Sequence, residues 1–84
     1  MNIINKQWVQ LRELPDAEIS EISYIRLQDI ERVSFVEISP NEIRIFVSAL
    51  GEKYYYTTVE TKGEAESMSK GLIEDIERSK ASKN

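Results

Sequence analysis

The strongest pattern in the chain is a pair of stretches in which apolar and polar residues alternate, IERVSFVEIS and EIRIFVSA, and it predicts two neighbouring strands. Pro40 and Asn41 lie between these stretches, and both suit the centre of a two-residue turn. The register counted outward from this turn has two pairs on each face: Ile38 with Ile43 and Val36 with Ile45 on one, and Glu37 with Arg44 and Phe35 with Phe46 on the other. An opposite-charge pair and an aromatic pair are favourable cross-strand neighbours, which supports the hairpin.

The sequence LGEK predicts a second hairpin turn with Gly51 and Glu52 at its centre, because a glycine in the first central position suits a type II′ turn. That register places Tyr54 and Tyr56 on the face that the helix covers and Tyr55 on the opposite face, since neighbouring strand residues point to opposite sides. A bulged three-residue loop would exchange the two sets of tyrosines, and the pattern leaves that alternative open.

The apolar spacing changes from a strand period to a helical period after Thr61. Thr61 and Glu64 form a capping box, the signature of a helix N-terminus. The apolar stripe that follows consists of Ala65, Met68, Leu72 and Ile76. We expect a helix of about 15 residues that lays this stripe on one face of the sheet. The residues expected on that face are Val36, Ile38, Ile43, Ile45 and Val47.

The first third of the chain carries weaker signals. Alternation predicts a strand over residues 6–13, ended by Pro15. Ile19 and Ile22 suit either one helical turn or two anchors of a plain loop, and the spacing does not decide between them. A short strand and a tight corner at 28–29 follow.

Together these elements predict an α+β fold: an antiparallel four- to five-stranded β-meander with one C-terminal helix packed on one face. A chain of 84 residues has room for one hydrophobic core. We therefore expect a single domain over residues 1–78, followed by a flexible polar tail over 79–84.

The composition argues against most chemistries. The chain contains no histidine and no cysteine, which removes the commonest general base, the thiol nucleophile and the commonest transition-metal ligands. Its net charge is −4, whereas general nucleic-acid binding needs a basic face, so nucleic acid is not the expected partner. We expect no enzyme activity, catalytic residue, metal site or cofactor. No apolar run approaches the ~18–20 residues of a membrane span, and we expect a cytoplasmic protein.

One sheet face stays uncovered in this arrangement and concentrates aromatic side chains. The residues expected to form this aromatic strip are Trp8, Phe35, Phe46 and Tyr55. A contiguous aromatic strip is typical of an interface, because monomers rarely leave large apolar patches bare. The alternative is that the segment 13–22 folds over the strip and turns it into a second small core.

The sequence therefore predicts a non-enzymatic protein–protein interaction module whose partner, a protein of unknown identity, binds the aromatic strip; a homo-oligomer also fits. The small size, acidity and lack of catalytic groups suit a small bacterial adaptor or a mobile-element (phage) inhibitor. The alternative is a binder of a small ligand or of nucleic acid, on the same face or in a groove between subunits.

Overall fold

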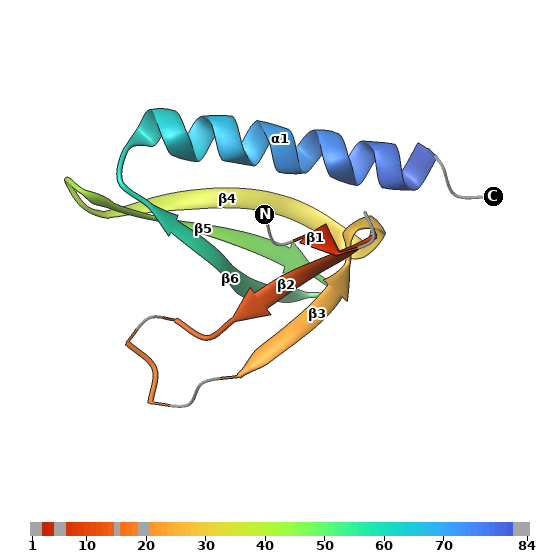
Figure 1. Cartoon of the computed structure of the whole chain (residues 1–84), viewed down its shortest axis with the longest axis horizontal. Coiled ribbons are helices and arrows are strands. Elements are labelled where there is room, and N and C mark those ends of the chain that lie inside the picture. The colour runs from red at the N-terminus through yellow and green to blue at the C-terminus, as the bar shows by residue number, and fades with distance from the viewer. Residues whose placement is uncertain (1–2, 5–6, 15, 19–20, 82–84) are drawn as a thin grey trace.

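The computed structural model of the chain describes residues 3–4, 7–14, 16–18 and 21–81. Its elements, in chain order, are β1 (Ile3–Ile4), β2 (Trp8–Arg12), β3 (Ile22–Arg26), the 3₁₀ turn η1 (Leu27–Asp29), β4 (Ile30–Ser39), β5 (Glu42–Ala49), β6 (Glu52–Val59) and α1 (Lys62–Ala81). The described strands form two antiparallel three-stranded sheets, and α1 runs along β4 on the second of them (Figure 1). The α+β class is as predicted.

The expected single meander is wrong, because β3 and β4 belong to different sheets. The sheet orders are β1–β2–β3, called here the first sheet, and β4–β5–β6, the second sheet. Between them lies η1, where Leu27 is buried and its backbone N–H donates to the carbonyl oxygen of Gln7 at 2.8 Å. This anchored corner redirects the chain, so that the first sheet folds against β6 instead of extending the second.

The first hairpin turn lies where the sequence predicts it, but the strands beyond it are shifted. Ser39 faces Glu42 across Pro40 and Asn41, as the two-residue turn requires. Ile38 is a bulged residue between the pair of Glu37 with Ile43 and the pair of Ser39 with Glu42. It moves the register by one residue. One extra residue is enough to reverse every face assignment that follows it.

The shifted register exchanges the faces expected for β4. Phe35 pairs with Ile45 and is half-buried against the core, whereas Val36 pairs with Arg44 on the opposite face. Val36 and Ile38 are 43 % and 49 % exposed. The predictions that Val36 and Ile38 lie under the helix, and that Phe35 faces Phe46, are therefore wrong.

The ion pair expected between Glu37 and Arg44 is also replaced. The Arg44 guanidinium pairs with the Glu42 carboxylate on its own strand at 2.9 Å. The Glu37 carboxylate pairs instead with the ammonium of Lys62 at the start of α1, at 3.3 Å. Both differences follow from the same one-residue shift.

The second hairpin turns one residue earlier than expected. Its central residues are Leu50 and Gly51, and Ala49 faces Glu52 across them. Leu50 has a φ of 54° and Gly51 a φ of 83°. Two positive φ values in succession are the pattern of a type I′ turn, so the expected type II′ turn is wrong.

The three consecutive tyrosines nevertheless lie on the faces that the sequence predicts. The register shifts again between the pair of Phe46 with Tyr55 and the pair of Ile45 with Thr57. This shift leaves Tyr56 as an extra, bulged residue. Tyr56 is 5 % exposed within the core, and Tyr54 packs against the core from the strand end. Tyr55 pairs with Phe46 on the opposite face. The faces are kept because moving a two-residue turn by one residue changes the register by two, whereas the bulge moves Thr57 and Val59 to the core side, opposite Ile45 and Ile43.

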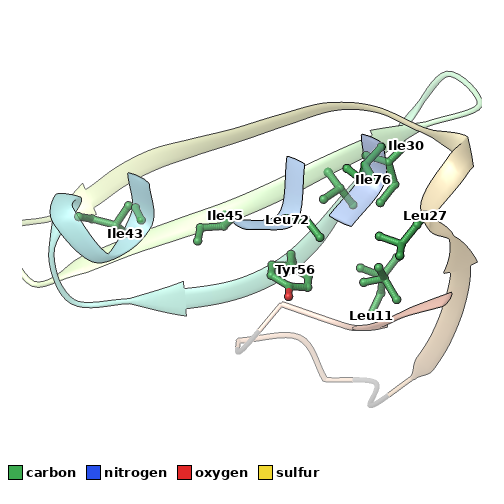
Figure 2. Packing of buried hydrophobic residues seen from close by; sticks show 11 residues of the cluster. Leu11, Leu27, Ile30, Ile43, Ile45, Tyr56, Leu72 and Ile76 are labelled. Carbon is green, nitrogen blue, oxygen red and sulfur yellow. The ribbon is translucent and has the colours of Figure 1, made fainter. Parts of the chain in front are cut away.

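The core joins both sheets to the helix (Figure 2). The first sheet contributes Val9 and Leu11, and Leu27 and Ile30 follow from the corner. The remaining buried residues of the cluster are Ile43, Ile45, Val47, Tyr56, Ala65, Leu72 and Ile76. Because the inner face of the first sheet is used in this core, its other face is left to solvent.

The helix begins with the predicted capping box. The Glu64 backbone N–H donates to the Thr61 hydroxyl at 3.1 Å, and the Thr61 N–H donates to the Glu64 carboxylate at 3.2 Å. Ser69 is buried where the stripe was expected to contain Met68, which is 41 % exposed. The helix reaches Ala81, so residues 79–81 of the predicted tail are helical, whereas 82–84 lie outside the described residues.

Candidate functional site

The four residues of the expected aromatic strip lie in three different places. Phe35 is on the core side of the second sheet, so it cannot belong to an exposed strip. Phe46 and Tyr55 are cross-strand neighbours on the other side of that sheet. Trp8 is on β2, in the first sheet. The structure brings together only Phe46 and Tyr55 of this set.

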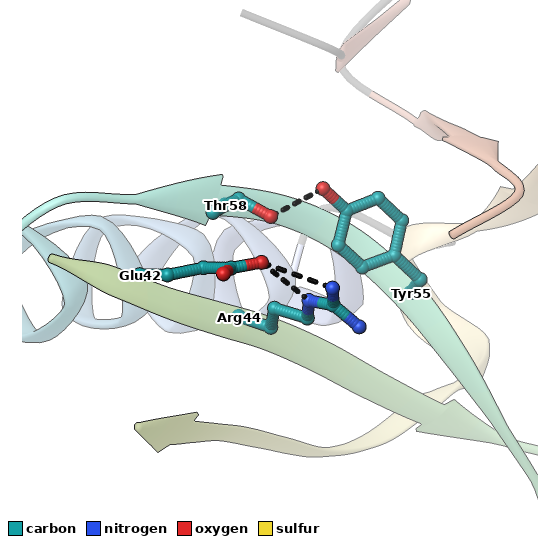
Figure 3. A network of polar contacts seen from close by, with 4 residues as sticks. All are labelled: Glu42, Arg44, Tyr55 and Thr58. Atoms are coloured by element: carbon teal, nitrogen blue, oxygen red, sulfur yellow. Dashed lines mark hydrogen bonds and ion pairs between the residues drawn. The ribbon is translucent and has the colours of Figure 1, made fainter. Parts of the chain in front are cut away.

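Phe46 and Tyr55 form an edge-to-face pair with ring centroids 6.1 Å apart and planes at 68°. The ammonium of Lys53 lies 5.1 Å from the centroid of the Phe46 ring, a cation–π contact. The Tyr55 hydroxyl is 2.6 Å from the hydroxyl of Thr58, beside the ion pair of Glu42 and Arg44 (Figure 3). These side chains are therefore engaged with one another within the chain.

A cleft of about 340 Å³ separates this pair from the end of β2. Leu11 and Leu14 line its other wall, and Glu13 and Glu21 stand beside them. The segment 13–22 thus borders the aromatic pair across a cleft, while residues 15, 19 and 20 lie outside the described residues. The rings of Phe46 and Tyr55 are half-buried.

The exposed face of the first sheet is a second and more open surface. Alternation along β2 buries Val9 and Leu11 and turns the intervening residues outward. The antiparallel register with β3 places Trp8 opposite Arg26, Gln10 opposite Tyr24, and Arg12 opposite Ile22. These six residues are called here the Trp8 face.

The apolar part of the Trp8 face is substantial for so small a protein. Ile22 and Tyr24 are 55 % and 48 % exposed, and Trp8 is half-buried beside them. Tyr24 is diagonal to Trp8 across the strand pair and two residues from Ile22 on the same face of β3, positions that aromatic side chains can span, so these three form a continuous patch. An exposed patch of this kind is typical of an interaction site.

The charge of the Trp8 face is positive, although the chain as a whole carries −4. Arg12 and Arg26 are both exposed, and the six side chains include no acidic group. The guanidinium carbon of Arg26 lies 5.2 Å from the centroid of the Trp8 ring. This cation–π contact holds Arg26 over the apolar patch instead of leaving it free in solvent.

The sequence could have indicated part of this face. Ile22, Tyr24 and Arg26 alternate outward in the same way as Trp8, Gln10 and Arg12. The prediction that Ile22 anchors a helical turn or loop is wrong, since Ile22 lies on β3 and is exposed. Its proposed companion Ile19 lies outside the described residues.

The described residues show little sign of reactive groups. The pKa of Tyr56 is raised above its ordinary value of 10.0, first by burial and second by the carboxylate of Asp75. In the described part of the chain, acidic side chains do not gather into a metal-binding group. No helix among these residues is long and apolar enough to cross a membrane.

Comparisons with protein-family models, with curated proteins and with solved structures find no match for this chain.

Proposed function

We propose that the protein is a non-enzymatic interaction module that binds an acidic surface of a partner protein through the Trp8 face. The observation that supports the proposal is the juxtaposition on one open face of Trp8, Tyr24 and Ile22 with two arginines and no acidic group. Trp, Tyr and Arg are the residue types that most often dominate binding free energy at protein interfaces.

The apolar residues supply the affinity in this proposal. Ile22 and Tyr24 lose about half of their surface from water when a partner covers them. Trp8 is already held by the guanidinium of Arg26, so little side-chain freedom is lost on binding. Truncation of an interface aromatic such as Tyr24 typically costs about 2 kcal/mol, which is about thirtyfold in affinity.

The arginines supply the selectivity. A chain with a net charge of −4 repels an acidic partner at long range, so attraction has to come from local positive charge. Arg12 and Arg26 provide it at contact distance, because charges beyond about 8 Å are largely screened at physiological salt. An acidic partner surface would therefore be oriented onto this face and away from the glutamates of α1.

Single-stranded nucleic acid is the second candidate for the same face. Aromatic side chains on an open sheet can stack with bases, and arginines can contact phosphates. Two arginines are few for this purpose in an acidic chain, which is why a protein partner is favoured.

The test begins with photo-crosslinking from position 24. A chain with p-benzoylphenylalanine in place of Tyr24 should crosslink one predominant protein in extracts of the source cells. The same amino acid in place of Met68, which is exposed to a similar extent on α1, is the control. Equal crosslinking from the two positions would contradict the assignment of the Trp8 face.

Affinity for the identified protein is then measured with purified components. Arg12→Glu is expected to weaken binding about tenfold or more. Arg78→Glu, which changes the net charge equally but lies on α1, should leave it unchanged. Equal affinities of these two variants would refute the proposal. Tight binding of mixed-sequence single-stranded RNA or DNA, weakened steeply by salt and lost in Tyr24→Ala, would assign the face to nucleic acid instead.

A further inference from the structure

The outer edge of β4 is open to solvent as well as the Trp8 face. In the second sheet β4 pairs with β5 along one side, and no strand of the described residues pairs with its other side. This edge is ten residues long, and α1 runs beside it (Figure 1). The backbone N–H and C=O groups along such an edge are a template for another strand.

Apolar side chains accompany this edge on both sides of the sheet. On the helix side, a groove of about 200 Å³ between β4 and α1 is lined by Ile30, Val33, Ile73 and Ile76. Ile73 is 44 % exposed, and Val33 in the same groove is half-buried. On the other side of the sheet, Val36 is 43 % exposed. An added strand would cover apolar surface in both layers.

Charged residues around the groove are balanced in sign. Glu31, Arg32, Glu77 and Lys80 line it, two acids and two bases in a chain whose net charge is −4. None of the four takes part in an ion pair with another described residue. A balanced rim of this kind can face its own copy without the repulsion expected from the rest of the molecule.

We infer that the β4 edge pairs with the β4 edge of a second copy of this chain. A two-fold axis perpendicular to the sheet makes the two strands antiparallel and keeps equivalent faces on the same side. The two three-stranded sheets become one six-stranded sheet, with both helices on the same face. The bulges at the two ends of β4 confine regular pairing to residues 32–37.

The position of the axis follows from the packing of α1 on β4. Ile73 and Val33 line the same groove, so an axis through Ser34, the residue after Val33, also brings the two copies of Ile73 close together. Val33 of each copy then faces Phe35 of the other on the helix side of the sheet, where both are half-buried in the single chain. The same contact covers Ile73.

Charge complementarity supports this occupant and this orientation. Antiparallel helices that meet at Ile73 place residues at equal distances before and after it opposite each other. Lys80 therefore faces Glu66 of the second copy, and Glu77 lies beside Lys70 of the second copy. All four side chains are exposed, and each contact occurs twice because of the symmetry.

The first experiment measures solution mass by light scattering. The wild-type chain is expected to have twice the mass of the 9.7 kDa monomer, and Ile73→Glu is expected to return to the monomer mass, because two carboxylates would meet at the axis. Met68→Glu is the matched control, since Met68 has a similar exposure but lies about 140° around the helix. Circular dichroism should show that both variants keep the helix.

The second experiment is a charge exchange. Lys80→Glu is expected to weaken the dimer about threefold or more, and adding Glu66→Lys in the same chain should restore it, because the pairs re-form with reversed sign. A monomeric wild type at millimolar concentration, equal masses of Ile73→Glu and Met68→Glu, or no rescue by the second substitution would overturn the inference. A dimer lost in Tyr24→Ala but kept in Ile73→Glu would do so as well, by placing the contact on the Trp8 face.

Discussion

Leu50 is held in a backbone conformation that suits other residues better. It occupies the first central position of the β5–β6 turn at a φ of 54° and is 77 % exposed. For most L-residues this left-handed region costs about 1–2 kcal/mol, whereas asparagine visits it readily because its short polar side chain can hydrogen-bond locally. Asn followed by Gly51 is the preferred sequence of a type I′ turn, so Leu50→Asn should stabilise the fold.

The size of the effect follows from two opposing terms. Relief of the unfavourable φ contributes about 1–2 kcal/mol. Complete burial of a leucine stabilises by about 1.5–3 kcal/mol, and only about a quarter of Leu50 is covered, so loss of the side chain costs about 0.5 kcal/mol. The expected net gain is about 1 kcal/mol, which in a domain of this size raises the Tm by about 4–8 °C.

The assay is urea unfolding together with thermal melting, all at one protein concentration because association would make the Tm depend on it. Leu50→Ala is the matched control: it loses the same side-chain contacts but lacks the short polar side chain that lets asparagine adopt the left-handed region. It should be no more stable than the wild type. If Leu50→Asn and Leu50→Ala have equal free energies of unfolding, the turn is not strained at this position and the reasoning is wrong.

Two further predictions concern buried polar groups. The Ser69 hydroxyl is buried without a hydrogen-bond partner in the described part of the chain, so Ser69→Ala should raise the free energy of unfolding by about 1 kcal/mol in urea titrations; a loss of similar size would show that the hydroxyl has a partner. The raised pKa of Tyr56 means that the folded state holds the phenolic proton more tightly than the unfolded state. The contribution of this proton to the free energy of unfolding is therefore complete below about pH 10 and is lost as the pH rises through the folded pKa. Tyr56→Phe should remove that part of the alkaline loss in unfolding curves measured against pH, Tyr24→Phe should not, and identical pH profiles of the two variants would contradict the assignment.

Local sequence signals were sufficient for the start of the helix and for the position of the first turn. Thr61 and Glu64 satisfy each other's backbone groups within four residues, so the start of α1 is readable without knowledge of the rest of the fold. Pro40 and Asn41 mark the first turn for the same reason. Where the free energy that decides a feature is contained in a few consecutive residues, the sequence is enough.

Register and face depended on contacts that are distant along the chain. The bulge at Ile38 carries no local signature, yet it places Phe35 against the core and leaves Val36 in solvent. Phe35 is absent from the expected strip for this reason, since a one-residue shift moves it to the other side of its strand, whereas Trp8 is absent because β2 lies in the first sheet.

By itself the sequence determined the α+β class, the start of α1 and the stretches that form β4, β5 and β6, together with the absence of histidine and cysteine. Only the tertiary structure decided that the strands divide into two sheets at the buried corner residue Leu27, and that Trp8 and Tyr24 therefore share an open face. The physical reason is that periodicity shows which residues share a side of one strand, whereas the side that becomes the core is chosen by how the whole chain buries its apolar surface.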